Sequence, residues 1–303
     1  MTAQARTLTR NRPISERVIE TLLFAAAALG VLTTVGIVIV LVYQTIEFFV
    51  RVSPIDFLTG TRWSALIQPN HWGVIPLING TLIIAGIALV IAVPLGLLAA
   101  VLLADYASPR VRNIVKPILE TIAGIPTIVL GFFAVYFLSP SILEPIFRDG
   151  IGGTSALAAG IVVGVLITPL IASISEDAMS AVPRGLREGA YAMGATKFEV
   201  VRKVVFPAAI SGIMASIILA MSRAIGETMA VVLAGGSNPT MSFNPLVSIQ
   251  TMTAFIAQIT VGDTPQGSTA FYSLFAVAMV LFLMTFVLNV ISARIVQRFR
   301  TAY

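Results

Sequence analysis

The chain has 303 residues, of which 57% are hydrophobic and 11% are charged, and its formal net charge is +5. Soluble domains carry roughly a quarter charged residues, so this composition, with a mean hydropathy of +0.96, excludes a soluble globule and indicates an integral membrane protein. The absence of cysteine and the single histidine exclude a disulfide framework, a thiolate nucleophile and a histidine metal cluster.

Six apolar segments are long enough to cross a bilayer, which takes about 20 helical residues. In chain order they lie near residues 18–43, 77–103, 117–138, 154–174, 208–234 and 271–292. We therefore predict an all-α integral membrane fold of six transmembrane helices. The membrane domain would cover residues 18–293, preceded by a cytoplasmic segment, 1–17, and followed by a cytoplasmic basic tail, 294–303.

Basic residues are distributed unevenly around these spans. Four precede the first span, three lie between the second and third, five between the fourth and fifth, and three follow the sixth, so 15 of the 19 fall on one side. By the positive-inside rule that side is cytoplasmic, and it includes both termini. The net charge thus reflects membrane topology, and we expect contact with lipid and no nucleic-acid partner.

Two longer loops, residues 51–76 and 237–270, would then lie outside. The first contains Trp63 and Trp72, which we interpret as anchors at the membrane interface. The second contains an uncharged stretch, residues 246–259, that predicts a helix too short to span the bilayer.

Glycines and prolines indicate where the spans bend or pack closely. Gly124 and Pro126 fall inside the predicted third span, where a break frees backbone groups that can line a cavity. Gly160 and Gly164 form a G-x-x-x-G pattern in the fourth span, which favours close packing against another helix.

The connection between the fourth and fifth spans carries strong local signals. Pro183 suits the first turn of a helix, and Gly194 is placed to end that helix in a left-handed conformation. Thr196 and Glu199 form a T-x-x-E capping box that begins a second helix. We predict a compact elbow over residues 183–206, made of two short helices around a glycine.

The fifth span contains two charged residues, Arg223 and Glu227. Their four-residue spacing places them on one face of a continuous helix. A charge within a membrane costs at least about 2.5–3.5 kcal/mol, so it must face a bundle interior or an aqueous path. A guanidinium suits a tetrahedral oxyanion, and Glu227 would hold Arg223 when the path is empty. The alternative is a structural ion pair that fixes this helix to a neighbour.

The elbow resembles the cytoplasmic loop of ABC importer permeases, whose pattern is E-A-A, three residues, G, nine residues and I-x-L-P. The matching positions are Glu188, Gly189, Ala190, Gly194, Val204, Phe206 and Pro207. Three of them differ from the pattern by small or apolar replacements. The resemblance implies a type I importer permease-like bundle that couples to an ATPase through Pro183, Arg184, Arg187, Glu188, Gly189, Ala190, Gly194, Thr196, Lys197 and Pro207.

The whole chain resembles, more specifically, the permease of phosphate-specific importers, its C-type rather than its A-type subunit. The resemblance rests on the elbow, on NGTLIIAGIALV from Asn79 and on SRAIGETMAV over residues 222–231. It implies a second permease subunit, two ATP-binding subunits and an extracytoplasmic phosphate-binding protein, in a bacterial or archaeal cytoplasmic (inner) membrane. The chain has no G-x-x-x-x-G-K-[ST] loop, so ATP would be bound by the partners and this chain would hold no cofactor.

Several alternatives stay open at this point. Another oxyanion, such as sulfate, molybdate or phosphonate, is one; phosphate keeps an O–H at neutral pH that Glu227 can accept, whereas sulfate offers none. A self-contained carrier or channel would need no ATPase. An integral membrane enzyme has no support, because no H-E-x-x-H, G-x-S-x-G or other catalytic constellation is present.

Overall fold

The computed structural model describes residues 14–148 and 151–298. Within them, six helices are long and apolar enough to cross a membrane. The predicted all-α fold with six spans is therefore confirmed. The two predicted cytoplasmic ends, residues 1–17 and 294–303, lie partly outside the described residues.

The elements are named in chain order, with η for π-helical segments. They are α1 (Ile14–Phe49), α2 (Pro54–Thr59), β1 (Trp63–Ser64), β2 (His71–Trp72), α3 (Ile75–Val101), η1 (Leu102–Tyr106), α4 (Pro109–Ala123), α5 (Thr127–Phe133), η2 (Ala134–Leu143), α6 (Glu144–Phe147), α7 (Ala156–Ser180), α8 (Arg184–Ala192), α9 (Lys197–Val200), η4 (Val201–Val205), α10 (Phe206–Gly226), α11 (Met229–Gly235), α12 (Met252–Val261) and α13 (Thr269–Arg298).

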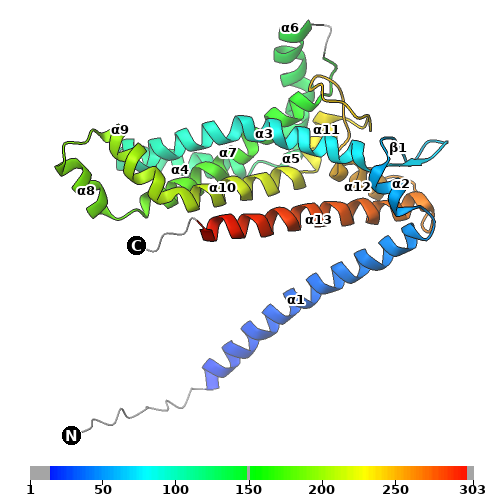
Figure 1. Cartoon of the computed structure of the whole chain (residues 1–303), viewed down its shortest axis with the longest axis horizontal. Coiled ribbons are helices and arrows are strands. Elements are labelled where there is room, and N and C mark those ends of the chain that lie inside the picture. Colours follow the sequence, from blue (N-terminus) through cyan, green and yellow to red (C-terminus); the bar gives the residue numbers. More distant parts are fainter. Residues whose placement is uncertain (1–13, 149–150, 299–303) are drawn as a thin grey trace.

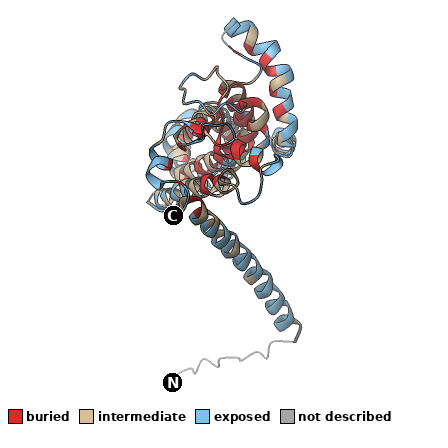
Figure 2. Ribbon diagram, turned by 90° about the vertical axis from the view of Figure 1, so that its right-hand side faces the viewer, coloured by how far each residue is buried: buried red, intermediate tan, exposed pale blue. Residues whose placement is uncertain are grey.

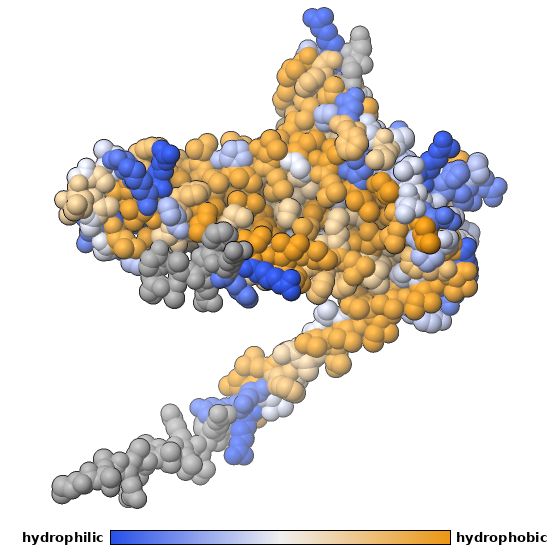
Figure 3. Space-filling view, in the orientation of Figure 1, coloured by the Kyte–Doolittle hydropathy of each residue, from blue (hydrophilic) through white to orange (hydrophobic). Residues whose placement is uncertain are grey.

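Four long helices, α3, α7, α10 and α13, run side by side and form the bundle (Figure 1). Buried residues concentrate where α3, α7 and α10 meet (Figure 2), whereas α1 leaves the bundle with almost its whole length exposed. Only its last turns pack on α13, where Thr45 Oγ1 donates to the carbonyl of Phe275 at 3.1 Å. The surfaces of α1 and of the bundle are predominantly hydrophobic (Figure 3), as contact with lipid or with another membrane subunit requires.

Small residues allow α3 and α7 to approach closely, and these two helices make the most extensive contact in the chain. Gly160 lies against the side chain of Ile87, and Gly164 lies against the backbone of Ala88. The packing role predicted for the G-x-x-x-G pattern is confirmed.

Adding one methyl group at Gly160 is expected to destabilise the bundle. A Cβ there would lie 2.5 Å from Ile87 Cγ2, so α3 and α7 would have to separate. The matched control is Gly86→Ala on α3, where a Cβ meets nothing within 4 Å and alanine gains helix propensity. Thermal unfolding in detergent should show a lower Tm for Gly160→Ala and not for Gly86→Ala. Equal Tm values for the two variants would contradict this packing.

The third span differs from the prediction. We expected one helix over residues 117–138, but α4 ends at Ala123 and the membrane-length segment is Thr127–Phe147. Pro126 is the cause: its extended conformation (φ −56°, ψ 128°) and missing N–H prevent the helix from continuing. The helix α4 is instead amphipathic and has no buried residue.

A β-hairpin and an aromatic cluster close the end of the bundle opposite α8 and α9 (Figure 1). The strands pair antiparallel, with Trp63 opposite Trp72. Trp63 is only 5% exposed and meets the ring of Phe255 edge-on at 4.8 Å between centroids. Trp63 is therefore a core residue of this end, and its interpretation as an interfacial anchor was wrong. The short helix predicted in the second outer loop is confirmed as α12.

Candidate functional site

The turn of the elbow is built as the sequence indicates. Gly194 has φ +82°, and its N–H donates to the carbonyl of Tyr191 at 2.9 Å. The next N–H, of Ala195, reaches the carbonyl of Ala190 at 3.1 Å, which completes a Schellman motif at the end of α8. Thr196 and Glu199 then form the predicted capping box at the start of α9.

The second arm of the elbow is longer than predicted. We expected two short helices and a separate fifth span, but Lys197–Gly226 is one continuous helix of 30 residues. Pro207 does not interrupt it, because the preceding segment η4 is π-helical and absorbs the missing backbone hydrogen bond. The elbow is thus joined directly to the membrane-spanning part of α10.

One side of the elbow presents apolar side chains to solvent. The exposed residues are Leu186, Tyr191, Met193 and Phe198, of which Met193 is 88% exposed. Glu188 is also exposed and, among the described residues, its side chain makes no hydrogen bond or ion pair. An exposed apolar surface with a charged neighbour is suited to a groove on another protein.

The other side of the elbow is fixed to the bundle by Arg187. Its guanidinium forms an ion pair with Asp105 of η1, and Nη2 donates to the carbonyl of Met179 in α7 at 2.6 Å. The Asp105 side chain is only 5% exposed. Removing one partner of a buried ion pair strands the other charge, at a cost of about 3–5 kcal/mol. Nearby, Lys197 Nζ lies 4.7 Å from the centroid of the Tyr106 ring, a cation–π contact.

A second ionic cluster joins α4 to α7. The carboxylate of Glu176 is fully buried and accepts hydrogen bonds from Lys116 Nζ and from the Ser180 hydroxyl, each at 2.9 Å. It also forms an ion pair with Arg112. The hydrogen bond to Asp177, and then that to Glu176, raises the pKa of Lys116 above its ordinary value, so the ammonium keeps its charge. The buried carboxylate is thereby fully paired, as its burial requires.

Arg223 and Glu227 do not form the predicted pair. The helix α10 ends at Gly226, Glu227 is extended (φ −66°, ψ 131°), and α11 begins at Met229. The carboxylate is buried and accepts the N–H of Ala230 at 3.4 Å. No ion pair within residues 14–148 and 151–298 includes Arg223. The expectation that Glu227 holds Arg223 was wrong, because the helix break removes the four-residue periodicity.

A residue of α12 stabilises the break between α10 and α11. Thr253 Oγ1 donates to the carbonyl of Glu227 at 2.8 Å, which satisfies one of the backbone groups that the break exposes. Arg223 remains in the last turn of α10, where the helix dipole favours a positive charge, and its side chain is exposed. A guanidinium exposed on a membrane-length helix must face another subunit or an aqueous path.

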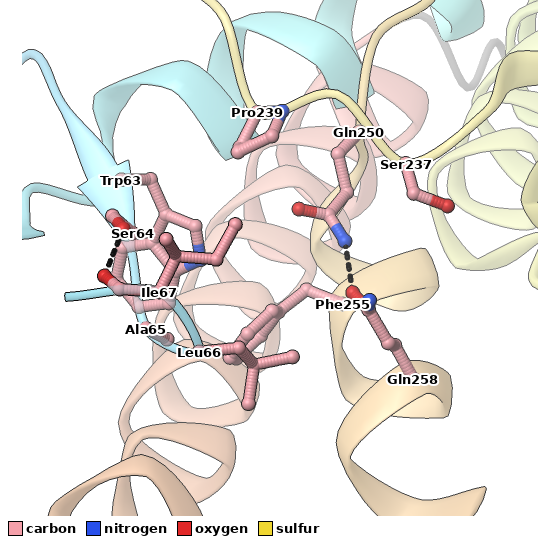
Figure 4. Close-up of a pocket in the computed structure, with 10 residues that line it drawn as sticks. All are labelled: Trp63, Ser64, Ala65, Leu66, Ile67, Ser237, Pro239, Gln250, Phe255 and Gln258. Atoms are coloured by element: carbon pink, nitrogen blue, oxygen red, sulfur yellow. Dashed lines mark hydrogen bonds between the residues drawn. The ribbon is translucent and has the colours of Figure 1, made fainter. Parts of the chain in front are cut away.

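A small cavity of about 100 Å³ lies between the β-hairpin, α12 and the loop that precedes α12. Gln250 donates to Gln258 at 2.6 Å on one wall, and Trp63 and Phe255 form the opposite wall (Figure 4). The cavity lining includes no charged side chain. In the described part of the chain, no group of three or more histidine, aspartate or glutamate side chains could hold a metal ion.

Comparison with known proteins assigns the chain to one family. Residues 92–301 match the family described as "Binding-protein-dependent transport system inner membrane component". The chain belongs to this family. The predicted resemblance of the chain to the membrane subunits of binding-protein-dependent importers is accordingly confirmed at the level of the family.

Curated relatives extend the match over most of the chain. "Probable ABC transporter permease protein YqgH" of Bacillus subtilis is 35% identical over 279 residues, which are 91% of this chain and 89% of the relative. "Phosphate transport system permease protein PstC" of Haemophilus influenzae is 36% identical over 214 residues, 64% of this chain and 67% of the relative. The protein of the same name from Mesorhizobium japonicum is 32% identical over 293 residues, 90% of this chain and 88% of the relative.

Solved structures show the same fold at low sequence identity. A chain of a bacterial ABC transporter involved in the import of the acidic polysaccharide alginate superposes with a TM-score of 0.66 at 14% identity, over 96% of this chain and 100% of that one. The MetNI methionine ABC transporter in an inward-facing conformation gives a TM-score of 0.55 at 22% identity, over 76% of this chain and 95% of that one. The bundle of this chain therefore has the same fold as chains of these two ABC transporters.

Proposed function

We propose that this chain is the membrane-spanning subunit of an ATP-driven importer of inorganic phosphate. The observation that carries the choice of phosphate is the likeness, at 32–36% identity, to relatives named as phosphate transport system permeases. That name also favours the C-type subunit. Arg223, a guanidinium exposed on a membrane-length helix and unpaired within the described chain, supplies the chemistry that an oxyanion path needs.

The partners follow from the same proposal. A second permease subunit would cover the exposed face of α10 and the length of α1. One of two ATP-binding subunits would take the apolar side of the elbow, and a binding protein would deliver phosphate at the α12 end. Residues 183–206 would be the coupling elbow within a membrane domain of residues 18–293. The assembly would reside in a bacterial or archaeal cytoplasmic membrane, and the ATP would be bound outside this chain.

The proposal is tested by purification and transport together. Tagged chain should copurify with an ATP-binding subunit, and the reconstituted assembly should take up radiolabelled phosphate only with ATP and the binding protein. Uptake that survives excess sulfate, molybdate and phosphonate supports phosphate, whereas competition by one of these ions would assign that ion instead. Uptake by the isolated chain without ATP would establish a self-contained carrier.

Topology gives an independent prediction. The natural chain has no cysteine, so single cysteines report their own exposure. In vesicles that lack the ATP-binding subunits, we expect Met193→Cys on the elbow, 88% exposed, to react with an impermeant maleimide only from the cytoplasmic side, and Val261→Cys at the end of α12, 83% exposed, to react only from outside. The reverse pattern in intact and inverted vesicles would overturn the orientation.

A further inference from the structure

The elbow is attached to the bundle by more than its continuous helix. Arg187 pairs with Asp105, and Lys197 lies over the ring of Tyr106. Asp105 and Tyr106 are consecutive and form the end of η1, the π-helical extension of α3. We refer to these two contacts as the inner clasp. One contact comes from each arm of the elbow, so the clasp fixes both arms to the same point of α3.

The opposite end of α3 is attached to the outer loop. Thr81 Oγ1 accepts the N–H of Met252, the first residue of α12, at 3.1 Å. One residue earlier, Gly80 lies directly against the carbonyl of Gln250, where a side chain would not fit. Gln250 and Gln258 form one wall of the outer cavity (Figure 4). The first residues of α3 therefore hold the loop that shapes this cavity.

We propose that α3 and η1 transmit the position of the elbow to the outer cavity, with Arg187 as the positioning residue that engages the clasp. This inference rests on the proposed function only in assigning the elbow to an ATPase. Its new content is the role of Arg187 and Lys197: they act inward, through Asp105 and Tyr106, and not on the ATPase surface. The side chain of Arg187 is only 18% exposed, which agrees with an inward role.

Two further features favour transmission through this contact. Asp105 Oδ2 is buried and has no hydrogen-bond partner among the described residues, so the carboxylate depends on Arg187 for its charge compensation. The same guanidinium holds the Met179 carbonyl, so a movement of α8 displaces η1 and the end of α7 together. The planar guanidinium reaches the two acceptors through separate nitrogens, Nη1 toward Asp105 and Nη2 toward Met179, in one fixed geometry that the single nitrogen of a lysine does not reproduce.

The test combines a labelling reporter in the outer cavity with a substitution in the inner clasp. Leu66 lines the outer cavity and is 50% exposed, so Leu66→Cys in the cysteine-free chain reports the state of the cavity by its rate of maleimide labelling. In the complete reconstituted complex we expect this rate to change between the nucleotide-free and the ATP–vanadate state. We expect the change to be lost in Arg187→Gln, together with the stimulation of ATP hydrolysis by the binding protein.

The controls separate transmission from folding. Arg187→Lys should recover part of the labelling change, because it restores one of the two contacts. Arg202→Gln, an exposed charge on η4 with no partner among the described residues, should leave the change intact. If Arg187→Gln does not assemble, Asp105→Asn preserves the shape of the site and removes the charge, and it should lose the labelling change in the same way.

Two results would overturn the inference. The first is a Leu66→Cys labelling rate that is the same in the nucleotide-free and the ATP–vanadate state when the rest of the chain is unchanged. The second is a nucleotide-dependent change in that rate that persists in both Arg187→Gln and Asp105→Asn. Failure of the proposed function is recognised separately. Suppose that the complex hydrolyses ATP and shows the nucleotide-dependent labelling change but does not import phosphate. That result would refute phosphate as the substrate and would not contradict the role proposed for the inner clasp.

Discussion

Replacing Arg223 with alanine is expected to reduce phosphate uptake to background while the subunit still reaches the membrane in normal amounts. The guanidinium is exposed and makes no ion pair within the described chain, so its removal strands no buried partner in this subunit. What is lost is the positive charge offered to the anion. Uptake of radiolabelled phosphate by reconstituted complexes, normalised to subunit abundance, measures the effect.

The matched control is Leu219→Ala, which truncates an exposed side chain one turn earlier on the same helix without removing charge. Arg223→Lys should recover little uptake, because an ammonium does not reproduce the planar two-donor arrangement. Normal uptake in Arg223→Ala would end the case for an anion site at this position.

Glu227 can be tested cleanly because its structural contact survives a change to glutamine. The amide oxygen of Glu227→Gln can still accept the N–H of Ala230, so the start of α11 is preserved while the negative charge is removed. If the carboxylate accepts the phosphate O–H, the variant should discriminate less well against sulfate. Unchanged discrimination would limit Glu227 to its role in α11.

The second large effect is expected at Gly194. In Gly194→Val the branched side chain must adopt φ +82°, a left-handed conformation that costs roughly 1–2 kcal/mol for a residue with a Cβ. A Cβ at this position meets nothing within 4 Å, so the strain comes from the backbone alone. We expect the turn to rearrange and ATP hydrolysis to continue without uptake.

Gly194→Asn separates strain from loss of glycine, because asparagine tolerates the left-handed region. It should retain most of the coupling that valine destroys. The ratio of phosphate imported to ATP hydrolysed, measured in proteoliposomes, distinguishes the variants. Equal ratios in the valine, asparagine and unchanged proteins would show that this turn does not couple the two processes.

Sequence reasoning was most accurate where structure depends on neighbours in the chain. The Schellman turn at Gly194 and the capping box at Thr196 are closed by hydrogen bonds across three to five residues, so their signals are local. It failed where an apolar sequence changes conformation without a strong breaker. The residues around Gly226 read as continuous helix, and the end of α10 is fixed instead by contact with Thr253, far along the chain.

The ionic contacts could not be derived from spacing. Arg187 and Asp105 are 82 residues apart, and Lys116 and Glu176 are 60 apart, so only the folded bundle brings them together. One signal was available: an acidic residue at the end of an apolar span, as Asp105 and Glu176 are, requires a cationic partner. The sequence contains several candidate partners on the same side and does not choose among them.

The unbroken helix from Lys197 to Gly226 has a mechanical consequence. Its 30 residues give a stiff lever about 45 Å long, with the elbow at one end and Arg223 close to the other. A tilt of about 5° about the elbow would displace the far end by about 4 Å, more than the length of a hydrogen bond. If the elbow docks on an ATPase and Arg223 meets the anion, as we propose, a modest rotation of the ATPase would bring the guanidinium to the anion or withdraw it without any change in the internal structure of the helix.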